Sequence, residues 1–482
     1  MRSKVLTPIN LVLLVFFFVY CLISIVNHFC FRTYALDLGA YTATMYDYAH
    51  FKIHDCSSFQ SNQENILAGH FDLYLLLLSP FSYLFGVYTL LFAQIFSVLA
   101  GGLGVYKLLL RFGNKTALIG AIYFLSFFGI FSAISFDYHS NVIASAFIPW
   151  LLLSLYQQKT KSFLFFFMLI IISRENISLI IAIMLPCMLL VEKEISTKFK
   201  KLVLVSTGFS LLYFAVITSW VMPALSSTGK LLQFKYDILG SNYLDAITNT
   251  FSHPIKYGSL LFKNHLANNS FDYIKTELWI FLGLSGGILL LLNFPFLIML
   301  LPVLAQKLFH NQAEMWGIND HYSAEFAPIL TVGIFYTLNQ RSFLKKRIRV
   351  LSYAVLLLSL GLTVRMMDNP NSGVRRDNVR IYKPLHYTSV VDRTSFNRIS
   401  KLIPDDASVS CQGLLHPHFA WRDKIYMYPT IKDASYILLY RTNEFWPLNK
   451  NEFENKLSEL EKDPAFEKIA DENDLVLFKR LK

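Results

Sequence analysis

Long apolar segments separated by short polar ones occupy the chain from about residue 8 to residue 364. A membrane-spanning helix needs about 20 mainly apolar residues, and residues 8–28 meet this length. Ten further apolar runs follow, and the shorter ones are expected to be tilted or broken helices inside a bundle. They lie near 88–110, 116–134, 140–157, 162–173, 176–191, 201–221, 277–291, 295–309, 325–339 and 347–364. The pattern predicts an all-α polytopic membrane protein with about 11 transmembrane helices.

Basic residues gather in every second predicted loop, as the positive-inside rule expects when the N-terminus is inside. These loops contain Arg2, Lys4, Lys107, Arg111, Lys115, Lys159, Lys161, Lys193, Lys198, Lys200, Lys201, Arg341, Lys345, Lys346, Arg347 and Arg349. Two large outer loops are then predicted, at 30–87 and 222–276. An odd number of spans places the C-terminal region outside, provided that residues 293–295 form the tip of a hairpin.

The pattern changes after residue 364. The segments at 407–415, 424–430, 434–440 and 474–480 look like short strands, and residues 449–463 have apolar positions at helical spacing. About 100 residues suffice for one small domain. We therefore predict a transmembrane domain at 1–364 and a small extracytoplasmic α/β domain at 365–482.

Composition supports the membrane assignment. Hydrophobic residues make up 54% of the chain and charged residues only 16%, whereas soluble domains carry about 25% charge. The formal net charge of +11 is spread over loops, while a nucleic-acid-binding protein concentrates its basic residues in one stripe. We therefore expect no nucleic-acid partner.

Ionisable residues share one side of this topology. Asp37 and Asp47 lie in the first outer loop, and four more sets of acidic residues with His or Arg lie near helix ends on the same side. These sets are His70 with Asp72, Asp137 with His139, Arg174 with Glu175, and His321 with Glu325. Ionisable groups at membrane depth are costly and mark functional sites by default. The sequence therefore predicts one polar site at the outer face of the membrane.

Each of these residues also has a structural interpretation. Asp37 suits a helix cap, Asp137 suits a turn, and Arg174 with Glu175 suits an ion pair at a broken helix. Clusters of His and carboxylates bind metals as well, but the sequence contains no tight metal motif. The cofactor stays open, with a divalent metal as one alternative.

Several segments resemble a known family. Residues 33–51 (TYALDLGAYTATMYDYAHF) and 69–86 (GHFDLYLLLLSPFSYLFG) resemble two segments of the domain-of-unknown-function 2079 family of polytopic membrane proteins. Residues 135–152, 173–185 and 321–330 resemble its later segments in the same order, and 403–430 resembles its C-terminal region. The resemblance spans nearly the whole chain. That family is similar to the GT-C glycosyltransferase superfamily.

The resemblance implies a GT-C-like fold in a cytoplasmic (inner) membrane. It also implies transfer of a sugar from a polyprenyl-phosphate carrier, a membrane lipid, to an unknown acceptor on the outer face. Asp37 matches the loop carboxylate that acts as base or metal contact, with Asp47 as its weaker companion. Arginine suits a phosphate group, so Arg174 is the expected lipid-phosphate contact. The remaining expected substrate-binding residues are His70, Asp72, Asp137, His139, Glu175, His321 and Glu325.

Two other functions stay open. A transporter or flippase predicts charges within several spans and related halves, and the sequence has few such charges and no fixed repeat. A non-catalytic membrane protein that binds a partner through its outer domain predicts recognition residues within 403–430.

Overall fold

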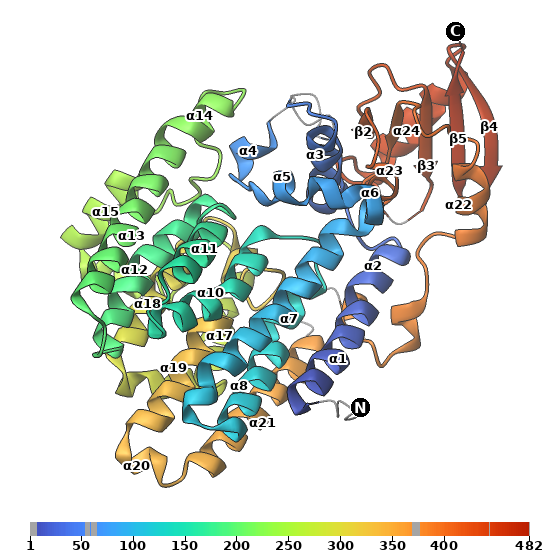
Figure 1. Cartoon of the computed structure of the whole chain (residues 1–482). Coiled ribbons are helices and arrows are strands. Elements are labelled where there is room, and N and C mark those ends of the chain that lie inside the picture. Colours follow the sequence, from blue (N-terminus) through green and yellow to red (C-terminus); the bar gives the residue numbers. More distant parts are fainter. Residues whose placement is uncertain (1–6, 54–57, 59–64, 369–375, 443, 482) are drawn as a thin grey trace.

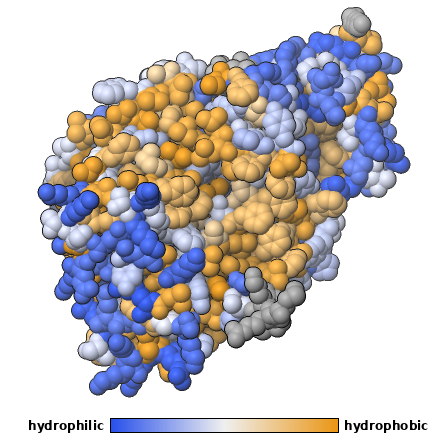
Figure 2. Space-filling view, viewed as in Figure 1, coloured by the Kyte–Doolittle hydropathy of each residue, from blue (hydrophilic) through white to orange (hydrophobic). Residues whose placement is uncertain are grey.

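The computed structural model describes residues 7–53, 58, 65–368, 376–442 and 444–481. Helices form most of the molecule, and a five-stranded sheet from the C-terminal residues lies at one end (Figure 1). On the face shown in Figure 2, apolar side chains cover the middle of the molecule. They separate a hydrophilic end around α20 (Ser342–Lys345) from the hydrophilic C-terminal sheet.

Four helical segments are long and apolar enough to cross a membrane: Pro8–Phe29, Tyr74–Phe112, Thr197–Leu225 and Ile348–Met367. A fifth arises if α8 (Asn114–Ser126) and α9 (Phe128–Ile134), which are bent by 45°, form one span. Phe127 breaks this pair because its backbone is extended, with φ −62° and ψ 137°. Four or five spans are therefore supported by length and composition among the described residues, and the expected number of 11 is not confirmed.

The helical bounds follow the apolar runs of the sequence closely. The first span comprises α1 (Pro8–Tyr20), a π-helical turn (Cys21–Ile25) and α2 (Val26–Phe29). The first outer loop contains a π-helical turn, η2 (Ala35–Gly39), followed by α3 (Ala40–Ala49), α4 (Ile66–Gly69), α5 (Tyr74–Leu78) and α6 (Ser82–Phe85). The bundle then contains α7 (Thr89–Leu109), α10 (Ser140–Tyr156), α11 (Thr160–Ile171), α12 (Glu175–Val191), α13 (Thr197–Val216), α17 (Ile274–Leu284), α18 (Phe294–Leu308), α19 (Phe326–Gln340) and α21 (Ile348–Met367). Between α13 and α17 lie the short α14 (Met222–Leu225), α15 (Tyr243–Ser252) and α16 (Pro254–Ser259).

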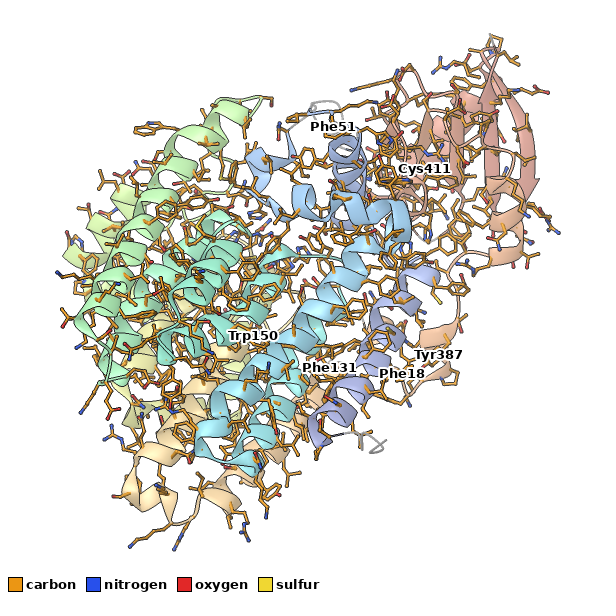
Figure 3. The ribbon with its side chains drawn as sticks, viewed as in Figure 1. Phe18, Phe51, Phe131, Trp150, Tyr387 and Cys411 are labelled. Carbon is orange, nitrogen blue, oxygen red and sulfur yellow. The ribbon has the colours of Figure 1, made fainter. Side chains whose placement is uncertain are left out.

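The α7 helix lies at the centre of the bundle and packs closely against its neighbours. A Cβ atom at Gly101 would lie 2.8 Å from the Ala146 carbonyl oxygen, and one at Gly102 would lie 2.8 Å from the Leu125 side chain. Small residues permit such close helix contacts in membranes. Phe131 of α9, which is labelled in Figure 3, packs edge-on against Tyr20 of the first span.

The C-terminal sheet has the strand order β2-β1-β3-β5-β4. Its strands are β1 (Val409–Cys411), β2 (Ile425–Met427), β3 (Tyr436–Tyr440), β4 (Phe466–Glu472) and β5 (Leu475–Arg480). β1 pairs in parallel with β2 and β3, and β5 pairs antiparallel with β3 and β4. Alternate side chains of β3 and β5 divide between two cores, because successive residues of a strand face opposite sides. One core lies under α22 (Arg393–Ser400) and α23 (His416–Phe419), and the other lies under α24 (Lys450–Lys462).

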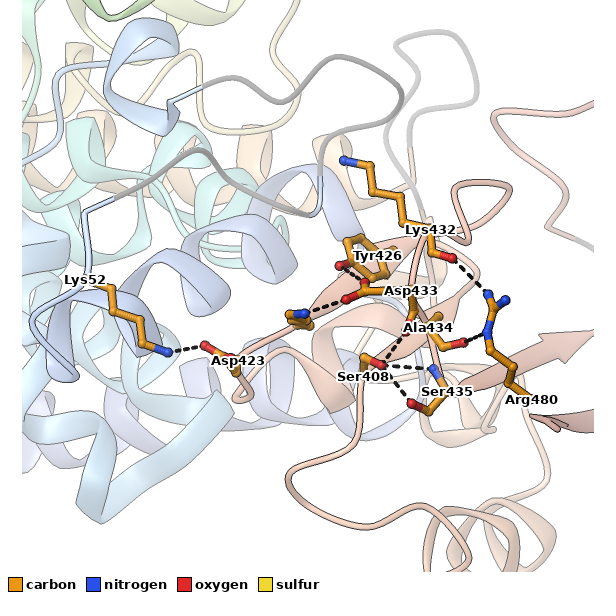
Figure 4. Close-up of polar contacts among 10 residues, drawn as sticks. Lys52, Ser408, Asp423, Tyr426, Lys432, Asp433, Ala434, Ser435 and Arg480 are labelled. Carbon is orange, nitrogen blue, oxygen red and sulfur yellow. Dashed lines mark hydrogen bonds and ion pairs between the residues drawn. The ribbon is translucent and has the colours of Figure 1, made fainter. Parts of the chain in front are cut away.

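The first outer loop is joined to the C-terminal region. Phe31 belongs to the core beneath the sheet. The guanidinium of Arg32 donates hydrogen bonds to four backbone carbonyls, those of Asp377, Leu385, His386 and Thr388, at 2.6–2.9 Å. At the rim, Lys52 forms an ion pair with Asp423 (Figure 4). Arg32, which also suits a phosphate by residue type, is therefore used to hold the chain together.

The end of the bundle away from the sheet is basic and contains a groove of about 1050 Å³. Arg111, Lys159 and Arg341 line this groove together with Asn293 and Pro295. The turn between α17 and α18 therefore lies at the same end as three of the basic loops.

We expect Arg32→Lys to destabilise the protein by about 2–3 kcal/mol, because an ammonium group cannot donate to four carbonyls in this fixed geometry. The measurement is thermal unfolding of the detergent-purified protein. Arg398→Ala is the matched control, since its exposed pair with Glu472 is worth less than about 1 kcal/mol. Equal melting temperatures for Arg32→Lys and the wild type would contradict the structural role of Arg32.

Candidate functional site

Asp37 lies in η2, and this turn is held by a second carboxylate. Asp137 accepts hydrogen bonds from the backbone N–H groups of Tyr34, at 3.1 Å, and Leu38, at 3.4 Å. The Asp137 backbone has a φ of +23°, and Gln94 of α7 donates to its carbonyl at 3.0 Å. The Gln94 side-chain oxygen also accepts the N–H of His139 at 2.9 Å. Asp137 therefore links the Asp37 turn to the segment that precedes α10, and Gln94 links that segment to α7.

A cavity of about 340 Å³ lies between this turn and the neighbouring helix ends. It brings together seven of the ten residues that the sequence singled out. These are Asp37, His70, His139, Arg174, Glu175, His321 and Glu325. They come from five separate segments of the chain, so the fold gathers them rather than any local motif.

Arg174 immediately precedes α12 and is only 5% exposed. Its guanidinium shares a hydrogen bond with the Tyr41 side chain, and its Nε–H has no partner. Glu175 instead accepts from His70 Nδ1 and from the Phe71 N–H, both at 3.0 Å. The ion pair between Arg174 and Glu175, which was the structural alternative, is therefore not formed. Arginine is rarely buried unless it is paired, and this one lines the cavity beside Tyr41.

His139 and His321 stack with their ring centres 3.4 Å apart, and Phe136 stacks on His139 at 5.3 Å. Burial and the nearby Arg174 charge lower the pKa of both imidazoles well below the usual range. Both rings are therefore neutral at physiological pH. Neither ring nitrogen of His139 has a hydrogen-bond partner, and the same is true of His321 Nδ1.

Glu325 closes the cavity on the side of α19. Asn141 donates to Glu325 Oε1 at 2.7 Å and to the His321 carbonyl at 3.3 Å, while Glu325 Oε2 has no partner. The loop before α19 is held close to α9, since a Cβ at Gly129 would lie 2.3 Å from the Ser323 carbonyl oxygen. Buried polar atoms without partners are rare and call for an explanation. Their concentration here indicates a polar ligand.

The other three predicted residues lie outside this cavity. Asp137 supports the Asp37 turn, as described above. Asp72 is buried and accepts hydrogen bonds from the Tyr74 N–H at 2.9 Å and the Tyr138 hydroxyl at 3.1 Å. Asp47 lies on α3 towards Lys52 and Asp423, with burial raising its pKa to about 7.

Sequence reasoning missed several residues that line the cavity. Lys235 and Tyr236 come from the second large outer loop, and Lys307 and Gln306 come from the end of α18. Lys307 donates to the Gly317 carbonyl at 2.9 Å, and Gln306 receives a hydrogen bond from Asn176 at 3.1 Å. The sequence signal for Lys235 was its place between Phe234 and Tyr236 in the outer loop 222–276, where the positive-inside rule expects few basic residues.

An apolar groove of about 140 Å³ continues from the cavity. The cavity and the groove share Asn176, Tyr236, Tyr243 and Gln306 as lining residues. Beyond them the groove is lined by apolar side chains, namely Leu179, Phe214, Phe234, Leu239, Ala246, Pro302, Ala305 and Phe309. The combined site therefore suits a ligand with a polar head and an apolar chain.

In the part of the chain that the structure describes, no group of three or more His, Cys, Asp or Glu residues is arranged to hold a metal ion. The His139 and His321 rings are stacked face to face, which does not direct their nitrogens to one common ligand position.

We expect Asp72→Asn to remove a pH dependence of stability. Burial raises the Asp72 pKa from 3.8 to about 7, so the folded protein keeps a proton that the unfolded chain releases. Wild-type stability should therefore fall as the pH rises from about 4 to about 7, and the neutral amide should lessen this fall. Melting temperatures of both proteins at about pH 5 and about pH 8 test this, and parallel shifts would contradict it.

A family model described as "Predicted membrane protein (DUF2079)" matches residues 27–477. A search of curated proteins finds no match. The family match covers the first outer loop, every cavity residue and all but the last three residues of the C-terminal sheet.

Proposed function

Because the chain belongs to the DUF2079 family of predicted membrane proteins, we propose that it is a membrane glycosyltransferase. It would move a sugar from a polyprenyl-phosphate carrier to an acceptor on the outer face of the membrane. The observation that carries this proposal is the buried Arg174 guanidinium, whose Nε–H has no partner. It lies in a cavity that Asp37 also lines and that shares four lining residues with an apolar groove.

The phosphate of the carrier would bind at Arg174. A guanidinium presents its donors in a fixed fork that matches phosphate oxygens. Lys235 lines the same cavity and adds positive charge. Neutral His139 and His321 can each donate one N–H to a phosphate or a sugar hydroxyl, whereas Glu175 holds His70 in place.

Asp37 would act as general base. Its carboxylate takes the proton of the acceptor hydroxyl, and the acceptor oxygen then bonds to the anomeric carbon of the sugar. The bond between that carbon and the phosphate oxygen breaks, and the electron pair leaves with the polyprenyl phosphate. Arg174 stabilises the charge that develops on this leaving group.

The lipid chain would lie in the apolar groove. Residues such as Phe214, Phe234 and Phe309 provide an apolar surface, and burial of apolar area is worth about 25 cal/mol per Å². Such a groove positions the head of a long lipid in the cavity and lets the rest of the chain extend into the bilayer.

The membrane arrangement is part of the same proposal. The chain would lie in a cytoplasmic (inner) membrane as a GT-C-like bundle of about 11 spans, some of them the short apolar helices such as α10, α12 and α18. The basic end with Arg111 and Arg341 would face the cytoplasm by the positive-inside rule. The cavity and the domain at 365–482 would then face outward.

We expect the wild-type protein to retain a polyprenyl phosphate on purification and Arg174→Ala to lose it. Native mass spectrometry of the detergent-purified proteins measures this directly, and a sugar that is still attached would add its mass. Arg174→Lys should retain less lipid than the wild type, since lysine lacks the planar fork. Arg349→Ala, which removes an exposed charge elsewhere, is the control and should behave as the wild type.

Only bulk phospholipid on all four proteins would contradict the donor site. The transporter and partner-binding alternatives would then explain the chain better. Thermal unfolding of each variant separates loss of lipid from loss of folding.

We expect Asp37→Asn to lower sugar transfer by at least about 100-fold, because general-base catalysis contributes about 10²–10⁴. The assay follows transfer from the lipid-linked sugar recovered with the wild type, and lipid retention should be unchanged. Asp47→Asn makes the same chemical change in the same outer loop but outside the cavity, so its activity should stay within about threefold of the wild type. Equal activities of the two variants would contradict the assignment of Asp37.

A further inference from the structure

A second cavity, of about 370 Å³, reaches Asp37 from the side of the C-terminal sheet. Its walls include Tyr34, Asp37 and Phe136 from the helical part and Gly413, Glu444 and Trp446 from the C-terminal part. Asp37 is the residue that this cavity shares with the polar cavity around Arg174. Asp37 therefore lines both the polar cavity around Arg174 and this second cavity.

Both walls of the second cavity are held in fixed positions. Gly39 lies two residues after Asp37 and packs directly on α23, because a Cβ at Gly39 would lie 2.3 Å from His416 Nδ1. Gln412, next to Gly413, donates to the Glu444 carbonyl at 2.7 Å. Gly413 itself is buried, yet a Cβ added there would meet no atom within 4 Å. The space is therefore a hollow between ordered segments.

The chemistry of the two cavities differs. The first contains Arg174, Lys235 and Lys307, whereas no Lys, Arg or His is among the described residues that line the second. The second instead offers two carboxylates and three aromatic rings, with Trp446 49% exposed at its opening. Carboxylates accept hydrogen bonds from hydroxyl groups and disfavour an anionic ligand, and aromatic faces pack against apolar C–H surfaces.

We propose that the second cavity is the acceptor site and that it takes a neutral saccharide. Asp37 faces the hydroxyl that is glycosylated, Glu444 binds a further hydroxyl, and Trp446 packs on the face of the sugar ring. Donor and acceptor then reach Asp37 from opposite sides, which keeps the acceptor away from the lipid phosphate until transfer. The role of this cavity as an acceptor site rests on the proposed transfer reaction. The binding of a saccharide to the cavity does not depend on that reaction.

The test places a thiol in the hollow. Gly413→Cys in a variant whose five native cysteines are replaced by alanine should react with a soluble maleimide. Methyl glucoside, methyl galactoside and methyl mannoside are the neutral probes, and glucuronate is the anionic one. At least one neutral sugar should slow the labelling of Cys at 413 in a saturable manner, and glucuronate should not. Gly258→Cys, where a Cβ also meets no atom within 4 Å, is the control and should show no protection.

Adding Trp446→Ala should raise the sugar concentration for half-protection by at least about fivefold, as loss of an aromatic contact predicts. Absence of protection by all three neutral sugars would overturn the proposal, and so would equal protection with and without Trp446. The labelling needs no lipid donor. Protection in a protein that retains no polyprenyl phosphate would therefore refute the proposed transfer alone, and retained lipid without protection would refute the acceptor site alone.

Discussion

The main physical constraint on the site is the cost of burying the charged Arg174 guanidinium without a directly paired carboxylate. Removal of an ion from water costs several kcal/mol even after relaxation, and Arg174 is only 5% exposed. The neighbouring imidazoles add no further positive charge next to the guanidinium. His139 and His321 stay neutral beside it, and Glu175, the adjacent carboxylate, is engaged by His70. The Tyr41 hydroxyl and the nearby carboxylates of Glu175, Asp72 and Glu325 offset part of this cost.

A second requirement is that distant segments meet at one turn. The Asp37 turn is held by Asp137 from the helical bundle and packs on His416 from the C-terminal part. Arg32 holds the chain between the last membrane helix and the sheet to the first outer loop. The catalytic carboxylate of the proposed reaction is therefore positioned by contacts from three parts of the sequence, none of which forms the turn alone.

Apolar periodicity and the placement of ionisable residues predicted much of this arrangement. Helices occupy the apolar runs. Seven predicted residues line one cavity, because ionisable side chains near the membrane core face the interior of the bundle or a polar cavity rather than lipid. Sequence alone cannot separate Asp72, a buried structural carboxyl, from Asp37, since both follow the same pattern. It also misses Lys307, whose place in the cavity lining depends on where α18 ends. β4 was not predicted because it is an edge strand with no buried side chain, so it lacks the apolar run of β3 and β5.

The other buried arginines explain why Arg174 is informative. Arg32 donates to four carbonyls, and Arg422 donates to the carbonyls of Phe419 and Ala407 at 2.8 Å. At the basic end, partly buried Arg111 pairs with Glu192 and donates to the Tyr336 hydroxyl at 2.9 Å. This fold therefore supplies acceptors wherever a guanidinium serves only to stabilise it. The Arg174 guanidinium instead has the Tyr41 hydroxyl and an Nε–H without a partner, next to unpartnered imidazole nitrogens. A bound anion would supply the missing acceptor.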